Sequence, residues 1–137
     1  MMTLIYCAGP LFNTHERWYI ERIAEVLEGA GYKTFVPHRD AGILTEFKES
    51  MRAHVFRVDM ESLSKCDACV ALLTGSDPDS GTCSEIGYLY AKGVPVIGLS
   101  DDVRNMNNFV WGVCNEGKNL VRNLDDVLPI LSQFVKP

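Results

Sequence analysis

The segment that most constrains the fold is an apolar run, Ala68–Leu73, that leads through turn residues into a helical pattern. The run shows no polar alternation, which is typical of a strand buried on both faces of a parallel sheet. Ser80 or Thr82 can cap the following helix, which we expect to reach about Lys92. The residues expected to face the sheet are Ile86, Leu89 and Tyr90. The loop between strand and helix therefore lies at the carboxyl end of a strand, where open α/β sheets bind ligands.

The rest of the chain alternates strand and helix patterns in the same way. The expected strands are Thr3–Ala8, Tyr32–Val36, Ala68–Leu73, Val94–Leu99 and Asn119–Val121. The other expected helices span about 14–30, 48–65 and 123–134, with loops at 37–42 and 100–108. We predict a single domain over 1–137 with an α/β, doubly wound, flavodoxin- or Rossmann-like fold. Its five-stranded sheet is expected to be mostly parallel, with helices on both faces.

Composition excludes several classes of function. The chain of 137 residues has a net charge of −5 and no Lys/Arg cluster, which argues against binding to a nucleic-acid polymer. No apolar run reaches the ~18 residues of a membrane span, so a cytoplasmic protein without a membrane partner is expected. The five cysteines are odd in number and lie mostly in apolar runs, as reduced core thiols do. Cys66 and Cys69 have no second pair with which to form a metal site, and no phosphate-binding glycine motif is present, so neither metal nor cofactor is expected.

Three carboxylates are candidate functional residues, and two of them lie in the loop and helix start at this sheet edge. Glu85 falls in the first turn of the helix that follows the central strand, Asp79 precedes it by six residues, and Asp59 lies in the long helix before the strand. Each has an ordinary structural interpretation. Glu85 can be a first-turn acid stabilised by the helix dipole, Asp79 a turn residue, and Asp59 a solvated helix residue paired with a nearby arginine.

Four sequence segments carry a family resemblance. They are Ile5–Phe12, Cys66–Ala71 with Asp59 before it, Asp79–Tyr88, and Asn107–Gly112. Together they resemble the nucleoside 2-deoxyribosyltransferase family over nearly the whole chain, and Asp79–Tyr88 is the most specific of them. The resemblance implies an enzyme of nucleotide salvage that acts on a 2-deoxynucleoside and a free nucleobase.

The same resemblance implies a role for each matching residue. Glu85 becomes the nucleophile that holds the sugar covalently, Asp59 protonates or orients the leaving base, and Tyr6 hydrogen-bonds the nucleophile. Other residues are implied to bind the substrate: Asp79, Ser80, Gly81, Gly9, Pro10 and Asn107. The family also implies a homo-oligomer, a dimer or larger, in which Asn107 reaches a neighbouring subunit's site.

The sequence leaves the exact activity open. The runner-up is a 2-deoxynucleoside 5-monophosphate N-glycosidase, which would use Glu85 in the same way and deliver the sugar to water. A non-catalytic nucleotide-sensing module is a third possibility, which three carboxylates at one sheet edge disfavour. The loop between Pro37 and Glu49 assigns neither purine nor pyrimidine preference, and His38-Arg39-Asp40 is interpreted equally well as base-pocket lining and as an ordinary polar loop.

Overall fold

The computed structural model describes residues 2–137 and contains one sheet of five strands covered by helices. The strands are β1 (Leu4–Ala8), β2 (Lys33–Phe35), β3 (Ala68–Leu72), β4 (Val96–Leu99) and β5 (Leu120–Val121). The helices are α1 (Thr14–Gly29), α2 (Pro37–Asp40), α3 (Glu49–Lys65), α4 (Ser80–Ala91), α5 (Asn108–Val113) and α6 (Val127–Leu131), with a 3-10 turn η1 (Leu124–Asp126).

The sheet has the order β2-β1-β3-β4-β5, and every neighbouring pair is parallel. The chain moves outward from β1 to β2 on one side and from β3 to β5 on the other. The strand order therefore reverses between β1 and β3, and this switch point is where such sheets bind ligands. The predicted doubly wound α/β fold is confirmed, and the sheet is parallel throughout.

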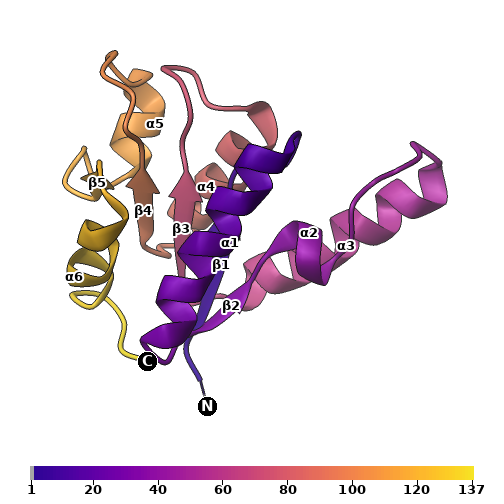
Figure 1. Ribbon diagram of the computed structural model, residues 1–137, viewed down its shortest axis with the longest axis horizontal. Coiled ribbons are helices and arrows are strands. Elements are labelled where there is room, and N and C mark those ends of the chain that lie inside the picture. Colours follow the sequence, from indigo (N-terminus) through magenta and orange to yellow (C-terminus); the bar gives the residue numbers. More distant parts are fainter. Residues whose placement is uncertain (1) are drawn as a thin grey trace.

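Two apolar cores fill the space on either side of the sheet (Figure 1). On one face α1 and α6 pack against β-strand residues such as Ile5 and Val70. On the other face α4, α5 and the end of α3 pack against Tyr6 and Ala71. The strands alternate their side chains between these layers, and β3 is buried along its whole length. Burial on both faces explains why the sequence of β3 is continuously apolar.

Helix α3 lies mostly outside the core and projects beyond the sheet in Figure 1. The apolar residues Met51, Val55, Val58 and Leu63 fall roughly along one face of α3, but Leu63 is its one buried residue. Met51 is 38% exposed because the amino-terminal half of α3 has no sheet beneath it. The carboxyl-terminal half returns to the sheet and brings Asp59 to the edge where β1 and β3 end.

Several local expectations were wrong. The α4 N-cap is Asp79, whose side chain accepts a hydrogen bond from the Thr82 backbone N–H, and neither Ser80 nor Thr82 occupies that position. Tyr90 is 58% exposed, because the carboxyl-terminal turn of α4 directs it away from the sheet. Trp18, expected in the buried stripe of α1, is likewise 58% exposed.

Two short helices form where no helix was expected. Residues 37–40 form α2, which Pro37 begins at a position where its missing N–H is harmless. Residues 108–113 form α5, capped by Asn107. The expected terminal helix divides into η1 and α6, and Pro129 falls in the first turn of α6, where proline is tolerated.

Candidate active site

A cavity of about 430 Å³ opens at the sheet edge beside the switch point. Its walls come from the loop after β1, the start of α2, the middle and second half of α3, and α4 with the residue before it. The lining residues are Gly9, Leu11, Phe12, Pro37, Phe56, Asp59, Met60, Leu63, Asp79, Gly81, Thr82, Ser84, Glu85 and Tyr88. Three carboxylates thus share a cavity with mainly apolar walls, and no Lys, Arg or His from residues 2–137 is among its lining side chains.

Glu85 lies in the second turn of α4, not in the first turn as expected, because the helix already begins at Ser80. Its carboxylate is directed toward the sheet. Its Oε2 accepts a hydrogen bond from the hydroxyl of Tyr6, which rises from the middle of β1. Burial raises the pKa of Glu85 to about 7, the Tyr6 hydroxyl opposes this rise, and the negative charges of Asp59 and Asp79 add to it. Near neutral pH the carboxylate is therefore partly protonated and poorly hydrated, which increases its reactivity when it ionises.

Tyr6 holds the Glu85 carboxylate from beneath the cavity. Its side chain is fully buried, and its ring stacks on that of Phe35 from β2 with ring centroids 5.3 Å apart. Burial, together with the neighbouring charges of Glu85 and Asp59, raises the pKa of Tyr6 far above its usual range, so that the hydroxyl remains a donor. Tyr6 can therefore fix the orientation of Glu85 while keeping its own proton.

Asp59 faces the same cavity from α3. Its Oδ1 is buried and has no hydrogen-bond partner among residues 2–137. Burial raises the pKa of Asp59 to about 6. Two carboxyl groups in one cavity, both with a pKa raised toward neutrality by burial, are suited to acid–base chemistry near neutral pH.

Asp79 has a structural duty as well as a place in the cavity wall. Its Oδ2 accepts from the Thr82 backbone N–H at 3.3 Å, and its Oδ1 accepts from the Thr82 hydroxyl at 2.5 Å. These bonds cap α4 and set the direction of its first turn, which carries Gly81 past the cavity. A carboxylate has acceptor sites beyond these two bonds, so Asp79 can also accept from a bound hydroxyl.

Gly9 allows the loop after β1 to lie close to its neighbours. A Cβ at this position would be 2.8 Å from Ile20 Cδ1 and 3.0 Å from Leu72 Cβ, which is closer than side chains tolerate. Pro10 is buried beside it but is not among the lining residues. Gly9 therefore forms part of the cavity wall, whereas Pro10 shapes the loop from behind.

Like Pro10, the expected binding residues Ser80 and Asn107 lie outside the cavity within one chain. Ser80 is exposed at the start of α4. Asn107 caps α5 by accepting from the backbone N–H groups of Phe109 at 3.0 Å and Val110 at 3.3 Å, and it donates to Asp77 Oδ1 at 3.1 Å. The position of Asn107 in a single chain is thus explained by its capping role.

The sequence did not single out most of the apolar cavity wall. Phe56 and Met60 line it from α3, and Tyr88 lines it from α4. Phe56 and Met60 flank Asp59 at offsets of three and one, so helical periodicity about Asp59 could have indicated Phe56. Phe12 is 77% exposed and Phe56 is 64% exposed, which means that part of the wall is open to solvent in the single chain.

Metal and membrane sites find little support in the described residues. Within 2–137 no group of three or more His, Cys, Asp or Glu side chains is placed to hold a metal ion. In the same part of the chain no helix combines the length and apolarity needed to cross a membrane. All five cysteines are free thiols, and four are buried.

The fold and the cavity define an all-parallel α/β protein with an acidic site at its switch point. Residues 5–124 match the family model described as nucleoside 2-deoxyribosyltransferase. The chain therefore belongs to the nucleoside 2-deoxyribosyltransferase family, as its sequence segments predicted. Members of this family act on small nucleosides and nucleobases.

Solved structures support the assignment. A conserved protein from Enterococcus faecalis V583 is 28% identical, with a TM-score of 0.83, and the match covers 98% of this chain and 100% of that one. A 2-deoxyribosyltransferase from Bacillus psychrosaccharolyticus is 25% identical with a TM-score of 0.82, covering 98% of both chains. A CMP N-glycosidase from Clostridium botulinum shares the fold at 20% identity and a TM-score of 0.62, covering 95% of this chain and 99% of that one.

One curated relative is longer than this chain. An uncharacterized protein of Schizosaccharomyces pombe is 25% identical over 122 residues, which cover 79% of this chain. The match spans 58% of the yeast protein's length.

Proposed function

We propose that this protein transfers 2-deoxyribose from a 2-deoxynucleoside to a second nucleobase through a covalent intermediate on Glu85. One observation carries the proposal: the Glu85 carboxylate, held by the Tyr6 hydroxyl, faces the same cavity as Asp59 and Asp79. Membership of the family and the likeness to a 2-deoxyribosyltransferase support it.

In the first half-reaction Glu85 attacks the anomeric carbon as the bond to the departing base breaks. A sugar without a 2-hydroxyl reaches an oxocarbenium-like transition state readily, and a carboxylate can trap it as a glycosyl ester. Asp59 gives its proton to the departing base, so that the base leaves neutral. The raised pKa of Asp59, about 6, keeps part of this group protonated near neutral pH.

In the second half-reaction an acceptor base attacks the same carbon and displaces Glu85. The proton lost by the acceptor returns to Asp59, and the Glu85 carboxylate is restored. Tyr6 donates to Glu85 at both ends of this cycle and stabilises the negative charge that reappears on it. If water replaces the acceptor base, the same intermediate produces free deoxyribose, which is the N-glycosidase reaction.

One incubation separates these activities. The protein is incubated with a 2-deoxynucleoside, with and without a free acceptor base, and nucleosides, bases and free deoxyribose are quantified. We expect a new nucleoside with the acceptor present and slow release of base without it. Rapid release of free deoxyribose in both reactions would assign the protein as a hydrolase, and no change in either reaction would leave only a binding function.

We also expect a preference for 2-deoxynucleosides over their 5-monophosphates. A role of Asp79 as acceptor for the 5-hydroxyl is supported by its position in the cavity wall, and the cavity lining described above contains no cationic side chain to neutralise a phosphate. Two like charges about 4 Å apart repel by about 4 kcal/mol at an effective dielectric constant of about 20. The expected preference in kcat/KM is therefore about a hundredfold or more.

Asp79→Ser tests this preference while keeping the helix cap, because serine is also a good N-cap residue. The variant is expected to narrow or reverse the preference and to weaken nucleoside turnover. The values of kcat/KM for a matched nucleoside and monophosphate are compared in both proteins. Asp102→Ser, which changes a carboxylate outside the cavity, is the control. A wild-type preference for the monophosphate would favour the N-glycosidase instead.

We further propose a homo-oligomer whose sites are completed across subunits by Asn107. Support comes from the open wall of the cavity, where Phe12 and Phe56 are more than half exposed. Covering such aromatic side chains is favourable and would exclude water from the reacting sugar. The exposed position of Asn107 on one chain is compatible with a contact to another.

Mixing two inactive variants tests the shared site. Asn107→Ser keeps an N-cap residue but removes the amide donor, and Glu85→Gln removes the nucleophile. If Asn107 acts across the interface of a dimer, a mixed dimer has one intact site, and equal mixing restores about a quarter of wild-type activity. Full activity of Asn107→Ser alone, or no recovery on subunit exchange, would contradict the proposal.

A further inference from the structure

A second cavity of about 350 Å³ continues from the first on the far side of Asp59. The two cavities share four lining residues, Leu11, Phe12, Pro37 and Asp59. Glu85 and Asp79 line only the first, whereas Arg17 and His38 line only the second. In the proposed reaction the sugar is held at Glu85 and Asp59 protonates the base. The base is therefore directed past Asp59, toward Arg17 and His38.

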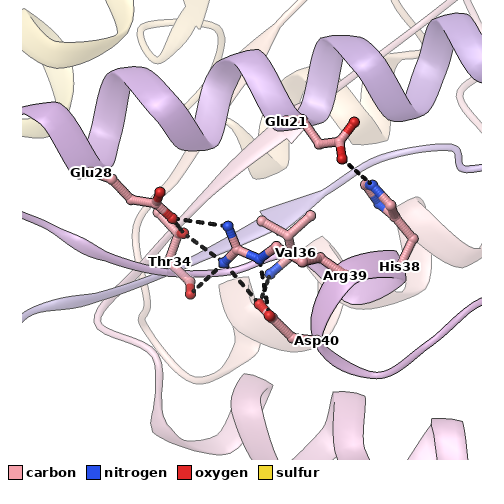
Figure 2. Close-up of polar contacts among 7 residues, drawn as sticks. All are labelled: Glu21, Glu28, Thr34, Val36, His38, Arg39 and Asp40. Carbon is pink, nitrogen blue, oxygen red and sulfur yellow. Dashed lines mark hydrogen bonds and ion pairs between the residues drawn. The ribbon is translucent and has the colours of Figure 1, made fainter.

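His38 is a buried polar side chain without a hydrogen-bond partner. The side chain is 7% exposed, and neither ring nitrogen has a hydrogen-bond partner among residues 2–137. Its Nε2 lies 3.4 Å from Glu21 Oε1 on α1, which is close enough for electrostatic attraction but lacks hydrogen-bond geometry (Figure 2). The negative charge of Glu21 favours the tautomer with hydrogen on Nε2, which leaves a lone pair on Nδ1 as an acceptor.

The neighbouring Arg39 holds α2, and hence His38, in place. Its guanidinium donates to Asp40 at 2.9 Å and 3.0 Å, to Glu28 Oε2 at 3.1 Å and to Thr34 Oγ1 at 3.2 Å (Figure 2). Asp40 also accepts from the Val36 backbone N–H at 2.8 Å. This network ties the short helix α2 to α1 and β2. The His38 ring is consequently presented by a fixed segment, as a specificity residue needs to be.

Arg17 supplies donors to the same cavity. It lies one turn before Glu21 on α1, and its Nη1 donates to the Leu11 carbonyl at 2.9 Å. A guanidinium has five N–H donors, so this bond leaves others for a ligand. The second cavity is therefore lined by a histidine whose ring nitrogens have no partner among residues 2–137 and by an arginine with further donors, within apolar walls formed by side chains such as Phe12 and Val55.

We propose that His38 and Arg17 select nucleobases in which a ring N–H lies beside a carbonyl oxygen. His38 Nδ1 accepts from the ring N–H, and Arg17 donates to the carbonyl. This edge is common to 6-oxopurines and 4-oxopyrimidines. In 6-aminopurines and 4-aminopyrimidines the donor and acceptor are exchanged, which leaves two buried groups on the protein unpaired and disfavours binding. The inference rests on the proposed function, because that function places the base beyond Asp59.

The test measures acceptor preference in pairs of bases. The kcat/KM for transfer is measured with hypoxanthine against adenine and with uracil against cytosine, using one donor nucleoside. We expect the oxo base of each pair to be preferred about tenfold or more. His38→Phe keeps a buried ring without nitrogens, and we expect it to lower this ratio about tenfold. Arg17→Met should act in the same direction, whereas His15→Ala, at an exposed histidine outside both cavities, should leave the ratio unchanged.

Binding of the free bases distinguishes failure of this inference from failure of the proposed function. Calorimetric titration of the same four bases needs no turnover. An oxo preference in binding that His38→Phe removes supports the inference even if no transfer occurs, in which case only the proposed function fails. Three results would each overturn the inference about base selection. They are transfer without an oxo preference, an oxo preference that His38→Phe and Arg17→Met leave intact, and binding of none of the four bases.

Discussion

Replacing Glu85 with glutamine is expected to slow deoxyribosyl transfer by about 10⁴-fold or more. Glutamine retains the shape of the side chain and can still accept from the Tyr6 hydroxyl. It cannot form the glycosyl ester on which the proposed reaction depends. The measurement is the initial rate of new nucleoside formation from a donor nucleoside and an acceptor base.

The control is Glu25→Gln, at an exposed carboxylate on α1 that pairs with Arg22. Both variants replace a carboxyl group with an amide of the same shape, so a difference between their transfer rates depends on the position of Glu85. Glu25→Gln is expected to transfer the sugar at the wild-type rate. Near-normal transfer by Glu85→Gln would show that another group is the nucleophile.

The same substitution is expected to stabilise the protein at alkaline pH. Burial raises the pKa of Glu85 from 4.5 to about 7, so the folded state retains a proton that the unfolded chain loses. The contribution of Glu85 to stability therefore falls as pH rises from about 4.5 to 7 and remains low above that range. At about pH 8, Glu85→Gln should raise the free energy of unfolding by up to about 3 kcal/mol. The Tm of Glu85→Gln should exceed the wild-type Tm by more at about pH 8 than at about pH 5. This result would show that the variant is folded and that its loss of transfer is a loss of chemistry.

Asp59→Asn is expected to lower kcat about 10²- to 10³-fold and to change the pH profile. Asp59 acts in its protonated form and Glu85 acts in its ionised form. Since burial raises both pKa values, to about 6 and about 7, the wild-type kcat/KM should form a narrow bell in that region. Activity falls at lower pH as Glu85 is protonated, and at higher pH as Asp59 loses its proton.

Asparagine at position 59 cannot donate an acidic proton, so the variant should lose the decline at high pH and keep the decline at low pH. Profiles of kcat/KM between about pH 5 and pH 9 test this expectation. Asp125→Asn, at an exposed carboxylate of η1, is the control and should leave the bell unchanged. A bell that persists in Asp59→Asn would assign the proton donor to another group.

The sequence predicted the sheet because most of its strands are short, apolar and bounded by turn residues. Ala68–Leu73 illustrates the point, since no surface strand would be apolar at every position. The helix cap was misassigned because Asp79, Ser80 and Thr82 are all good capping residues within one turn of the chain. Only the backbone conformation selects Asp79, which is extended while Ser80 begins the helix.

The helix faces were less predictable because exposure depends on where the sheet ends. Trp18, Met51 and Tyr90 all match a helical apolar pattern, but each lies where no layer covers it. The short helices α2 and α5 were missed for a different reason. They contain four and six residues, which is too short for a helical apolar pattern to be recognised in the sequence. Hydrogen bonds to other elements decide whether such short helices form.

The candidate site was predictable in part from chain order. The carboxyl ends of adjacent parallel strands share one edge, so Gly9 after β1 and Glu85 after β3 were expected to meet. Asp59 required the family resemblance, because a carboxylate in the middle of a long helix has no strand end to position it. Arg17 and His38 were not expected to share a cavity, since their meeting depends on how α2 packs against α1 (Figure 2).

The most direct test of the account is to trap the sugar on the protein. A 2-deoxynucleoside with fluorine on the 2-carbon destabilises the oxocarbenium-like transition state, so an ester formed on Glu85 should break down slowly and accumulate. Intact-mass and peptide mass spectrometry should find one fluorodeoxyribosyl group on Glu85 in the wild type and none on Glu85→Gln, and an acceptor base should discharge it. A protein that transfers deoxyribose without forming this adduct, or that carries the label on another residue, would contradict the assignment of Glu85 as the nucleophile.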